Sequence, residues 1–185
     1  MGDLKLRLLI LLLFIPVPAL AQKYIEIPDM YFQVSQEKNV PADLLFAITL
    51  VESNLKTNKG RILPWPWTVN HRGTPYRFAT RQAMYDFCAA LVEKGDYSFD
   101  VGGAQVNWYW HSNRFSSLWS ATDPLTNLRG AGDYLRENFN SSRDWWYATG
   151  KYHNPTDEER ASSYRAKVKK IWSQINSQRK NKHEK

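Results

Sequence analysis

Hydrophobic residues recur at helical spacing through most of this chain. Six segments place apolar residues three and four positions apart, which is the period of an α-helix with one buried face. The pattern predicts helices over residues 28–38, 40–55, 80–95, 123–135, 142–150 and 156–175. A chain with this pattern is expected to fold as a mainly α-helical domain.

Residues typical of helix ends mark several of these boundaries. Thr80 stands at an N-cap position, and Gly95 follows the last apolar residue of the same predicted helix. The other predicted ends are Pro28-Asp29, Pro41 in a first turn, Asp123-Pro124, Ser142 as a cap with a break at Gly150, and Thr156 with Glu159 in the capping-box position.

Two segments lack the helical period. Residues 56–80 are rich in Gly, Pro, Asn and aromatic residues, so we expect a long ordered loop or a small strand-like flap. Residues 97–107 contain the pair Gly102-Gly103, which lets the backbone approach a ligand closely or adopt positive φ angles. A loop is expected there.

One carboxylate interrupts an apolar helix face. Leu45, Ile48 and Glu52 lie on the same side of the helix predicted over 40–55. A carboxylate against apolar side chains loses hydration, so its pKa should rise toward neutrality and it could donate a proton near pH 7. The alternative is that Glu52 turns to solvent at the helix end or pairs with an Arg.

The N-terminus has the features of a secretory signal peptide. Lys5 and Arg7 precede an apolar run over 8–15, and Ala19-Leu20-Ala21 supplies a small-residue cleavage pattern. We therefore expect residues 1–21 to direct export to the periplasm, with an uncleaved anchor as the alternative. The predicted domain then spans 22–178, and the charged tail 179–185 is expected to be disordered.

Charge and cysteine content narrow the partners. The chain has a formal net charge of +7, and removing residues 1–21 takes away two cations and one anion, so the exported protein stays basic. An exported basic protein is expected to bind an acidic cell-wall polymer, a membrane surface or another protein. Nucleic acid is disfavoured because Lys and Arg are scattered. The only cysteine, Cys88, predicts no internal disulfide and fits core packing.

Aromatic residues make up 14% of the chain, including eight Trp and ten Tyr. Their flat faces can cover the apolar side of a pyranose ring, as in sugar-binding clefts. They can equally fill the core. Composition alone leaves both interpretations open.

Four short motifs follow one another along the chain: Glu52-Ser53, Gly102 to Gln105, Asn127 to Leu135, and Tyr152 to Asn154. Their order resembles the soluble lytic transglycosylase family, whose pattern is ES, GLMQ, NLxxGxxYL and AYN. The resemblance covers about residues 40–175. It is closest to members associated with conjugation and type IV secretion, which share segments found here at 64–70 and 100–107.

Two positions depart from the family pattern. Ala104 stands where the family usually has Met, and His153 separates the Tyr and Asn of the last motif. The second departure puts the family role of Asn154 in question.

The resemblance implies a lysozyme-like single domain of the α+β superfamily, with the Trp- and Pro-rich segment as a loop insert. It implies cleavage of the β-1,4 bond between N-acetylmuramic acid and N-acetylglucosamine, giving a 1,6-anhydro end without water as nucleophile. Glu52 would be the single catalytic acid and base, and Tyr152 would orient its carboxyl. The residues expected to bind substrate are Ser53, Gln105, Asn107, Tyr152, Asn154, Trp65 and Trp67.

No cofactor or metal is expected, because the four histidines lack short ligand spacing and no paired cysteines support zinc. The expected partners are glycan strands and envelope-spanning conjugation or secretion proteins, and a monomer is expected. Two alternatives stay open. One is a hydrolysing muramidase with Asp96 or Asp100 as a second carboxylate, and the other is a non-catalytic wall-binding or secretion-scaffold protein.

Overall fold

A computed structural model describes residues 25–56 and 62–183. The predicted signal peptide, residues 1–21, lies outside the described residues. The helices are α1 (Asp29–Lys38), α2 (Ala42–Ser53), α3 (Arg81–Glu93), α4 (Trp108–His111), α5 (Leu118–Ala121), α6 (Pro124–Ser142), α7 (Trp145–His153) and α8 (Glu158–His183), with a 3₁₀ turn η1 (Ser112–Arg114). The strands are β1 (Asn54–Lys56), β2 (Ile62–Pro64), β3 (Thr68–His71), β4 (Thr74–Arg77), β5 (Phe99–Val101) and β6 (Val106–Asn107).

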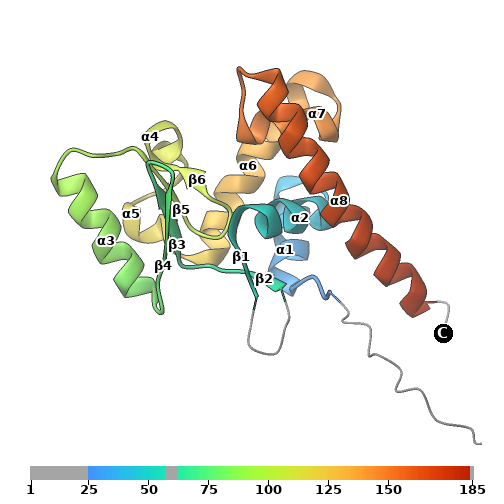
Figure 1. Cartoon of the computed structure of the whole chain (residues 1–185), viewed down its shortest axis with the longest axis horizontal. Coiled ribbons are helices and arrows are strands. Elements are labelled where there is room, and N and C mark those ends of the chain that lie inside the picture. The colour runs from blue at the N-terminus through green and yellow to red at the C-terminus, as the bar shows by residue number, and fades with distance from the viewer. Residues whose placement is uncertain (1–24, 57–61, 184–185) are drawn as a thin grey trace, which may run out of the picture.

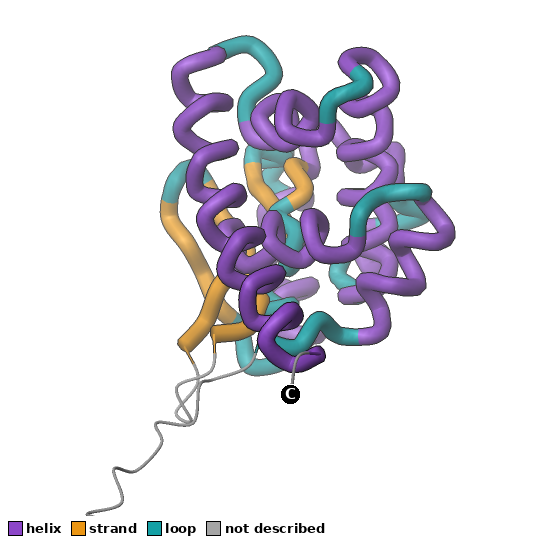
Figure 2. Tube along the Cα trace, turned by 90° about the vertical axis from the view of Figure 1, so that its right-hand side faces the viewer, coloured by secondary structure: helices purple, strands orange, loops and turns teal. Residues whose placement is uncertain are grey.

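Helix α2 lies at the centre of the helical part of the molecule (Figure 1). Its apolar residues are buried on every side, including Leu45, Phe46 and Ile48, which are fully inaccessible to solvent. Helix α1 packs on one side of α2 and α8 on another, and α6 and α7 complete the helical part. Figure 2, which is viewed from the side of α8, shows this helix running along the length of the helical part.

The strands form two antiparallel sheets. Strands β1 and β2 pair as a short ribbon, and the larger sheet has the order β4-β3-β5-β6. Val69 of β3 pairs with Val101 of β5, and both are buried in the core. Helix α3 packs beside this sheet, where the Phe87 ring lies 4.7 Å from the Tyr76 ring. The protein is therefore mainly helical with a small antiparallel sheet, as an α-rich α+β fold.

Several element predictions are confirmed. Helix α1 ends at Lys38 and buries Tyr31 and Val34. The Thr80 side chain caps α3 by accepting from the Ala83 N–H, and Asp123 caps α6 in the same way. In α3 and α6 a short polar side chain stands directly before an apolar helical pattern, so the start of the helix could be predicted from the sequence.

Other predictions need correction. The segment expected as a loop over 97–107 is a hairpin of β5 and β6. Of the two possibilities considered for 56–80, the strand-like flap is the one found, because β2, β3 and β4 form there. The tail was expected to be disordered from residue 179, but α8 continues to His183. The helices α4 and α5 were not predicted, because four residues are too few to show a helical period.

Three predicted helix ends are also wrong. Gly150 does not end α7, which continues to His153. A Cβ on Gly150 would lie 3.2 Å from the Ala161 Cβ, so its small size allows close packing on α8. Asp144 rather than Ser142 caps α7. Helix α8 begins at Glu158, after Asp157 accepts from the Arg160 N–H, so Thr156 is not its cap.

Within 25–56 and 62–183, none of the helices combines the length and the apolar composition needed to cross a membrane.

Candidate active site

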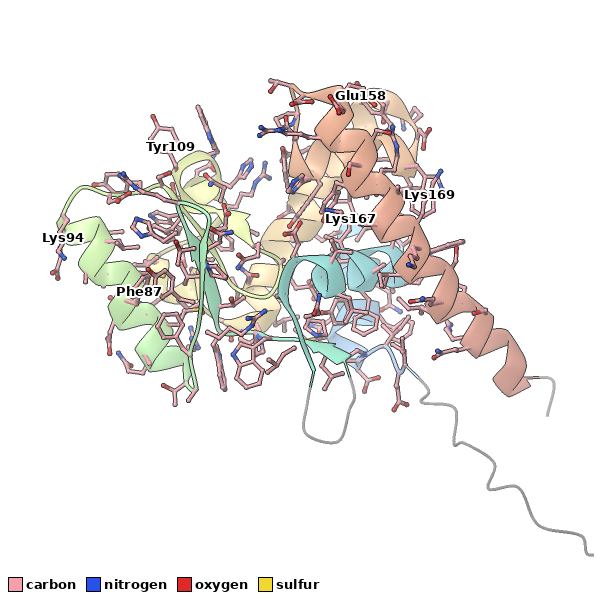
Figure 3. The ribbon with its side chains drawn as sticks, in the orientation of Figure 1. Phe87, Lys94, Tyr109, Glu158, Lys167 and Lys169 are labelled. Carbon is pink, nitrogen blue, oxygen red and sulfur yellow. The ribbon has the colours of Figure 1, made fainter. Side chains whose placement is uncertain are left out.

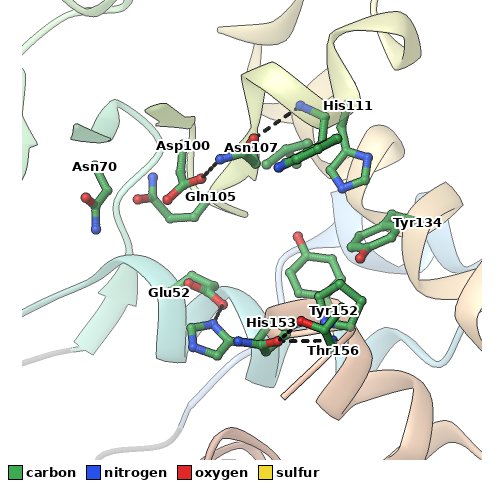
Figure 4. A pocket seen from close by; sticks show the side chains of 14 residues that line it. Glu52, Asn70, Asp100, Gln105, Asn107, His111, Tyr134, Tyr152, His153 and Thr156 are labelled. Atoms are coloured by element: carbon green, nitrogen blue, oxygen red, sulfur yellow. Dashed lines mark hydrogen bonds and ion pairs between the residues drawn. The ribbon is translucent and has the colours of Figure 1, made fainter. Parts of the chain in front are cut away.

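A cavity of about 740 Å³ opens where α2, the larger sheet and α7 meet. This volume is in the range of ligand-binding pockets. In Figure 4, Glu52 and His153 lie on one side of the cavity, and Asp100, Gln105 and Asn107 lie on the opposite side. The lining residues are Glu52, Asn70, Asp100, Gln105, Val106, Asn107, Trp110, His111, Tyr134, Tyr152, His153, Asn154, Pro155 and Thr156.

Glu52 is the penultimate residue of α2, and its side chain is 15% exposed. The pKa of this carboxyl is raised from 4.5 to about 7, chiefly by burial, and the nearby negative charge of Asp100 contributes to the rise. The hydroxyl of Tyr164 and the charge of Lys167 act in the opposite direction. Glu52 is therefore a carboxyl that is substantially protonated near neutral pH and faces a cavity, as its place on the apolar helix face predicted.

Two groups from other helices lie against the Glu52 carboxyl. The Tyr164 hydroxyl of α8 is buried near Glu52 and lowers the pKa of its carboxyl. Within the described part of the chain, its oxygen meets the distance and angle criteria of a hydrogen bond with no partner. The Nδ1 atom of His153 lies 3.9 Å from the Glu52 Oε1 atom. Neither residue was expected near Glu52. Tyr164 lies in the helix that was predicted over 156–175.

A second acid faces the same cavity. Burial raises the pKa of Asp100, and a hydrogen bond of 2.7 Å from the Asn107 Nδ2 atom opposes that shift. Asp96, the other carboxylate considered as a second acid, does not line this cavity. It pairs with His71 and Arg72, and the hydrogen bond from His71 lowers its pKa.

Gln105 lines the cavity and also fixes its own loop. Its φ angle of 49° lies in the left-handed region, which is uncommon for a residue with a side chain. The side-chain Nε2 atom donates to the Gly102 carbonyl at 2.8 Å and to the Thr68 carbonyl at 3.3 Å. The amide nitrogen is thus used within the protein. The amide oxygen accepts no hydrogen bond from the described residues, which leaves it available for a donor in the cavity.

Asn127 of α6 holds the 102–105 loop from behind. Its Nδ2 atom donates to the carbonyls of Val101 and Ala121, and its Oδ1 atom accepts from the Ala104 N–H. The side chain is 2% exposed, and a Cβ on Gly102 would overlap it. Gly102 of the second motif therefore leaves the space that the Asn127 side chain of the third motif needs to hold the loop.

Ser53 was predicted to line the site, and the structure places it elsewhere. Its side chain is buried at 1% exposure, and its Oγ atom lies within hydrogen-bond distance of the Thr49 carbonyl at 3.0 Å and the Gly103 carbonyl at 2.6 Å. Consecutive helical residues point about 100° apart, so Glu52 and Ser53 do not face the same cavity. Ser53 ties α2 to the 102–105 loop.

Tyr152 lines the cavity, but its hydroxyl does not orient Glu52 as predicted. The hydroxyl donates to the Ala104 carbonyl at 2.7 Å, and only 8% of the residue is exposed. The contact joins the start of the last motif to the 102–105 loop. Tyr164 is the hydroxyl that interacts with Glu52 instead.

Asn107 and Asn154 both line the cavity, and the side-chain oxygen of each accepts from nearby backbone N–H groups. The Asn107 Oδ1 atom accepts from the Trp110 N–H at the start of α4. The Asn154 Oδ1 atom accepts from the N–H groups of Thr156 and Asp157. Each amide holds a segment of cavity wall, so contact with a ligand would be an additional role.

Trp65 and Trp67 were predicted to form a substrate wall, but neither residue lines this cavity. The two rings pack edge to face at 5.9 Å, and the Trp65 Nε1 atom donates to the Phe78 carbonyl. The tryptophan that lines the cavity is Trp110, which is 72% exposed. The sequence signal for it was the Asn107 cap before a Trp-Tyr-Trp run.

In residues 25–56 and 62–183, no group of three or more His, Cys, Asp and Glu side chains is placed to hold a metal ion.

Comparison of the chain with protein-family models, with curated proteins and with solved structures finds no match. The function proposed below therefore depends on the geometry of the cavity and on the motif order.

Proposed function

We propose that this protein is a peptidoglycan lytic transglycosylase with a lysozyme-like domain and that Glu52 is its catalytic acid and base. The observation that carries the proposal is the Glu52 carboxyl at the cavity, with a pKa raised to about 7 by burial. Such a group holds a proton in about half of the molecules at pH 7 and can still give it up.

The reaction needs one carboxyl to act twice. Glu52 gives its proton to the glycosidic oxygen as the bond from that oxygen to the anomeric carbon breaks. The C6 hydroxyl oxygen of the same N-acetylmuramic acid unit then bonds to the anomeric carbon, and its proton passes to the Glu52 carboxylate. The products are a 1,6-anhydro end and a new N-acetylglucosamine end, and Glu52 is again protonated.

The cavity has groups suited to an amino sugar. The amide oxygen of Gln105 can accept from an N-acetyl N–H or from a hydroxyl. The exposed Trp110 ring lines the cavity and offers a flat apolar face to a pyranose. Peptidoglycan lies outside the cytoplasm, which agrees with the export signal predicted over residues 1–21. A role in wall opening by a conjugation or secretion apparatus rests on the motif resemblance alone.

A hydrolysing muramidase is the second candidate, and Asp100 is the observation that favours it. This acid faces the same cavity as Glu52 and could position a water molecule for attack, as the second carboxylate does in inverting glycosidases. The transglycosylase is preferred because the motif order points to a single-acid route.

Digestion of purified peptidoglycan in H₂¹⁸O separates the two reactions. We would treat sacculi with residues 22–185 and identify the new glycan ends by mass spectrometry. Anhydro ends without ¹⁸O support the transglycosylase, and reducing ends that carry ¹⁸O support the hydrolase. A folded protein that releases no glycan under either analysis would contradict both.

A further inference from the structure

His153 is held above Glu52 by a stacked tyrosine. The imidazole ring lies parallel to the Tyr164 ring, at an interplanar angle of 4° and with 4.4 Å between the ring centroids. This arrangement fixes the plane of the imidazole, so that Nδ1 lies 3.9 Å from the Glu52 Oε1 atom. In Figure 4 the ring stands beside the Glu52 carboxyl at the edge of the cavity.

The distance is about 1 Å longer than a hydrogen bond. Hydrogen bonds of catalytic groups are often long without substrate and shorten in the complex. His153 is half exposed, at 48% of its side chain, so it has room to move toward Glu52. A small rotation within the stack would bring Nδ1 to the carboxyl.

We propose that His153 is a positioning residue that donates its Nδ1–H to Glu52 and thereby sets the pH range in which the site works. The inference rests on the proposed function, and it concerns the regulation of the same site. As Glu52 loses its proton to the glycosidic oxygen, negative charge develops on the carboxylate, and a donor aimed at Oε1 becomes stronger. The other Glu52 oxygen remains free to face the glycosidic bond.

The charges around the pair favour a neutral imidazole. Burial lowers the pKa of His153, and the positive charges of Lys167 and Arg160 lower it further. Lys167 lies on the stretch of α8 that passes α2 (Figure 3). A neutral imidazole can donate from Nδ1 without competing for the proton that Glu52 must deliver. The titratable and charged groups that face His153 and Glu52 are Asp100 from β5, Tyr152 from α7, and Arg160, Tyr164 and Lys167 from α8.

Four side chains at position 153 separate donation from stacking. His and Phe keep an aromatic ring on Tyr164, and Asn and Leu remove it. His and Asn present an N–H near the Nδ1 position, and Phe and Leu do not. The matched variants are therefore His153→Phe, His153→Asn and His153→Leu, each measured beside the wild type.

The first readout is the pH dependence of peptidoglycan cleavage. Loss of the donor in His153→Phe and His153→Leu should lower the rate by about tenfold to a hundredfold. It should also move the alkaline limb of the profile upward by about one pH unit, because the ionised Glu52 is less stabilised. His153→Asn should stay within about threefold of the wild type, as the strength of a retained hydrogen bond implies.

The second readout does not depend on cleavage. The pKa of Glu52 can be followed by ¹³C NMR of the labelled carboxyl with a saturating N-acetylglucosamine oligomer bound, because the hydrogen bond is expected to shorten in the complex. Melting temperatures are measured in parallel. The proposal predicts that this pKa rises in the Phe and Leu variants and stays near the wild-type value in the Asn variant.

If the pKa of Glu52 is instead the same in the wild type and the Phe variant, and differs from a value shared by the Asn and Leu variants, His153 serves only to stack on Tyr164. That result overturns the proposal. An unchanged titration in all four proteins overturns it as well. If the titration follows the donor but the wild type cleaves no glycan, the proposed function fails while the positioning of Glu52 by His153 stands.

Discussion

The hydroxyl of Tyr152 donates to the carbonyl of Ala104 at 2.7 Å and so joins α7 to the loop that carries Gln105. The bond is buried, and it links two of the four motifs that are distant in the sequence. Replacement by Phe would leave the Ala104 carbonyl without its partner. The energetic effect should therefore fall on the fold of the loop.

We expect Tyr152→Phe to lower the free energy of unfolding by about 1–3 kcal/mol, the cost of one unsatisfied buried acceptor. Urea denaturation measures this change. The cleavage rate of the folded fraction should fall by less than about threefold, because the interaction with Glu52 comes from Tyr164. Unchanged stability together with a tenfold slower rate would instead place Tyr152 in direct contact with the catalytic carboxyl.

Asn127→Ala should destabilise the protein by about 3 kcal/mol or more, because it removes three buried hydrogen bonds that hold the 101–104 backbone and α5. Asn138→Ala on the same helix is the matched control. Its side-chain nitrogen donates only to the Tyr134 carbonyl within α6, so its cost should stay below about 1 kcal/mol. Equal stabilities of the two variants in urea would refute the supporting role of Asn127.

Glu52→Gln should make the folded state more stable at pH 8 and leave its stability unchanged at pH 4. The folded pKa of Glu52 is raised from 4.5 to about 7, so the wild type loses stability as the pH rises through this range. The loss amounts to about 2–4 kcal/mol, and an amide does not suffer it. Chemical denaturation at the two pH values tests this. A difference that does not depend on pH would mean that Glu52 is not desolvated in the folded protein.

Asp100→Asn should leave anhydro products and shift the alkaline limb of the cleavage profile to lower pH. The negative charge of Asp100 raises the pKa of Glu52, and the amide removes that charge. Lys167→Met should shift the limb in the opposite direction, because Lys167 lowers the same pKa. Complete loss of cleavage in Asp100→Asn, with a normal melting temperature, would favour the hydrolytic route.

Trp110→Ala should weaken the binding of glycan strands by about tenfold without changing the melting temperature, since the ring is 72% exposed at the cavity. Tyr109→Ala is the control, because Tyr109 is 59% exposed on the same helix but does not line the cavity. Trp67→Ala should show the reverse pattern, a lower melting temperature with unchanged affinity of the folded fraction. Equal binding by the Trp110 and Tyr109 variants would exclude Trp110 from the site.

The place of Glu52 could be predicted because it depends on a local pattern. Helical periodicity alone puts its carboxyl on the apolar face of α2. Ser53 was misplaced because a motif of adjacent residues does not reveal that their side chains point about 100° apart.

The rest of the site depends on contacts between distant segments. His153 and Tyr164 meet through the packing of α7 on α8, and Asp100 reaches the cavity through the pairing of β5 with β3. No periodic signal marks these relationships. Trp65 and Trp67 were expected at the cavity for the same reason, because a cluster of Trp and Pro residues does not show which rings will pack inside the fold.

The most direct test of the central claim is the rate at which wild type and Glu52→Gln release glycan fragments from purified peptidoglycan at pH 6, with both proteins shown to be folded by circular dichroism. The account predicts anhydro fragments from the wild type and at least a hundredfold lower rate from the Gln variant, which retains the shape but cannot exchange a proton. A Gln variant with more than about a tenth of the wild-type rate, a barrier change below about 1.4 kcal/mol, would contradict the assignment of Glu52 as the catalytic acid and base.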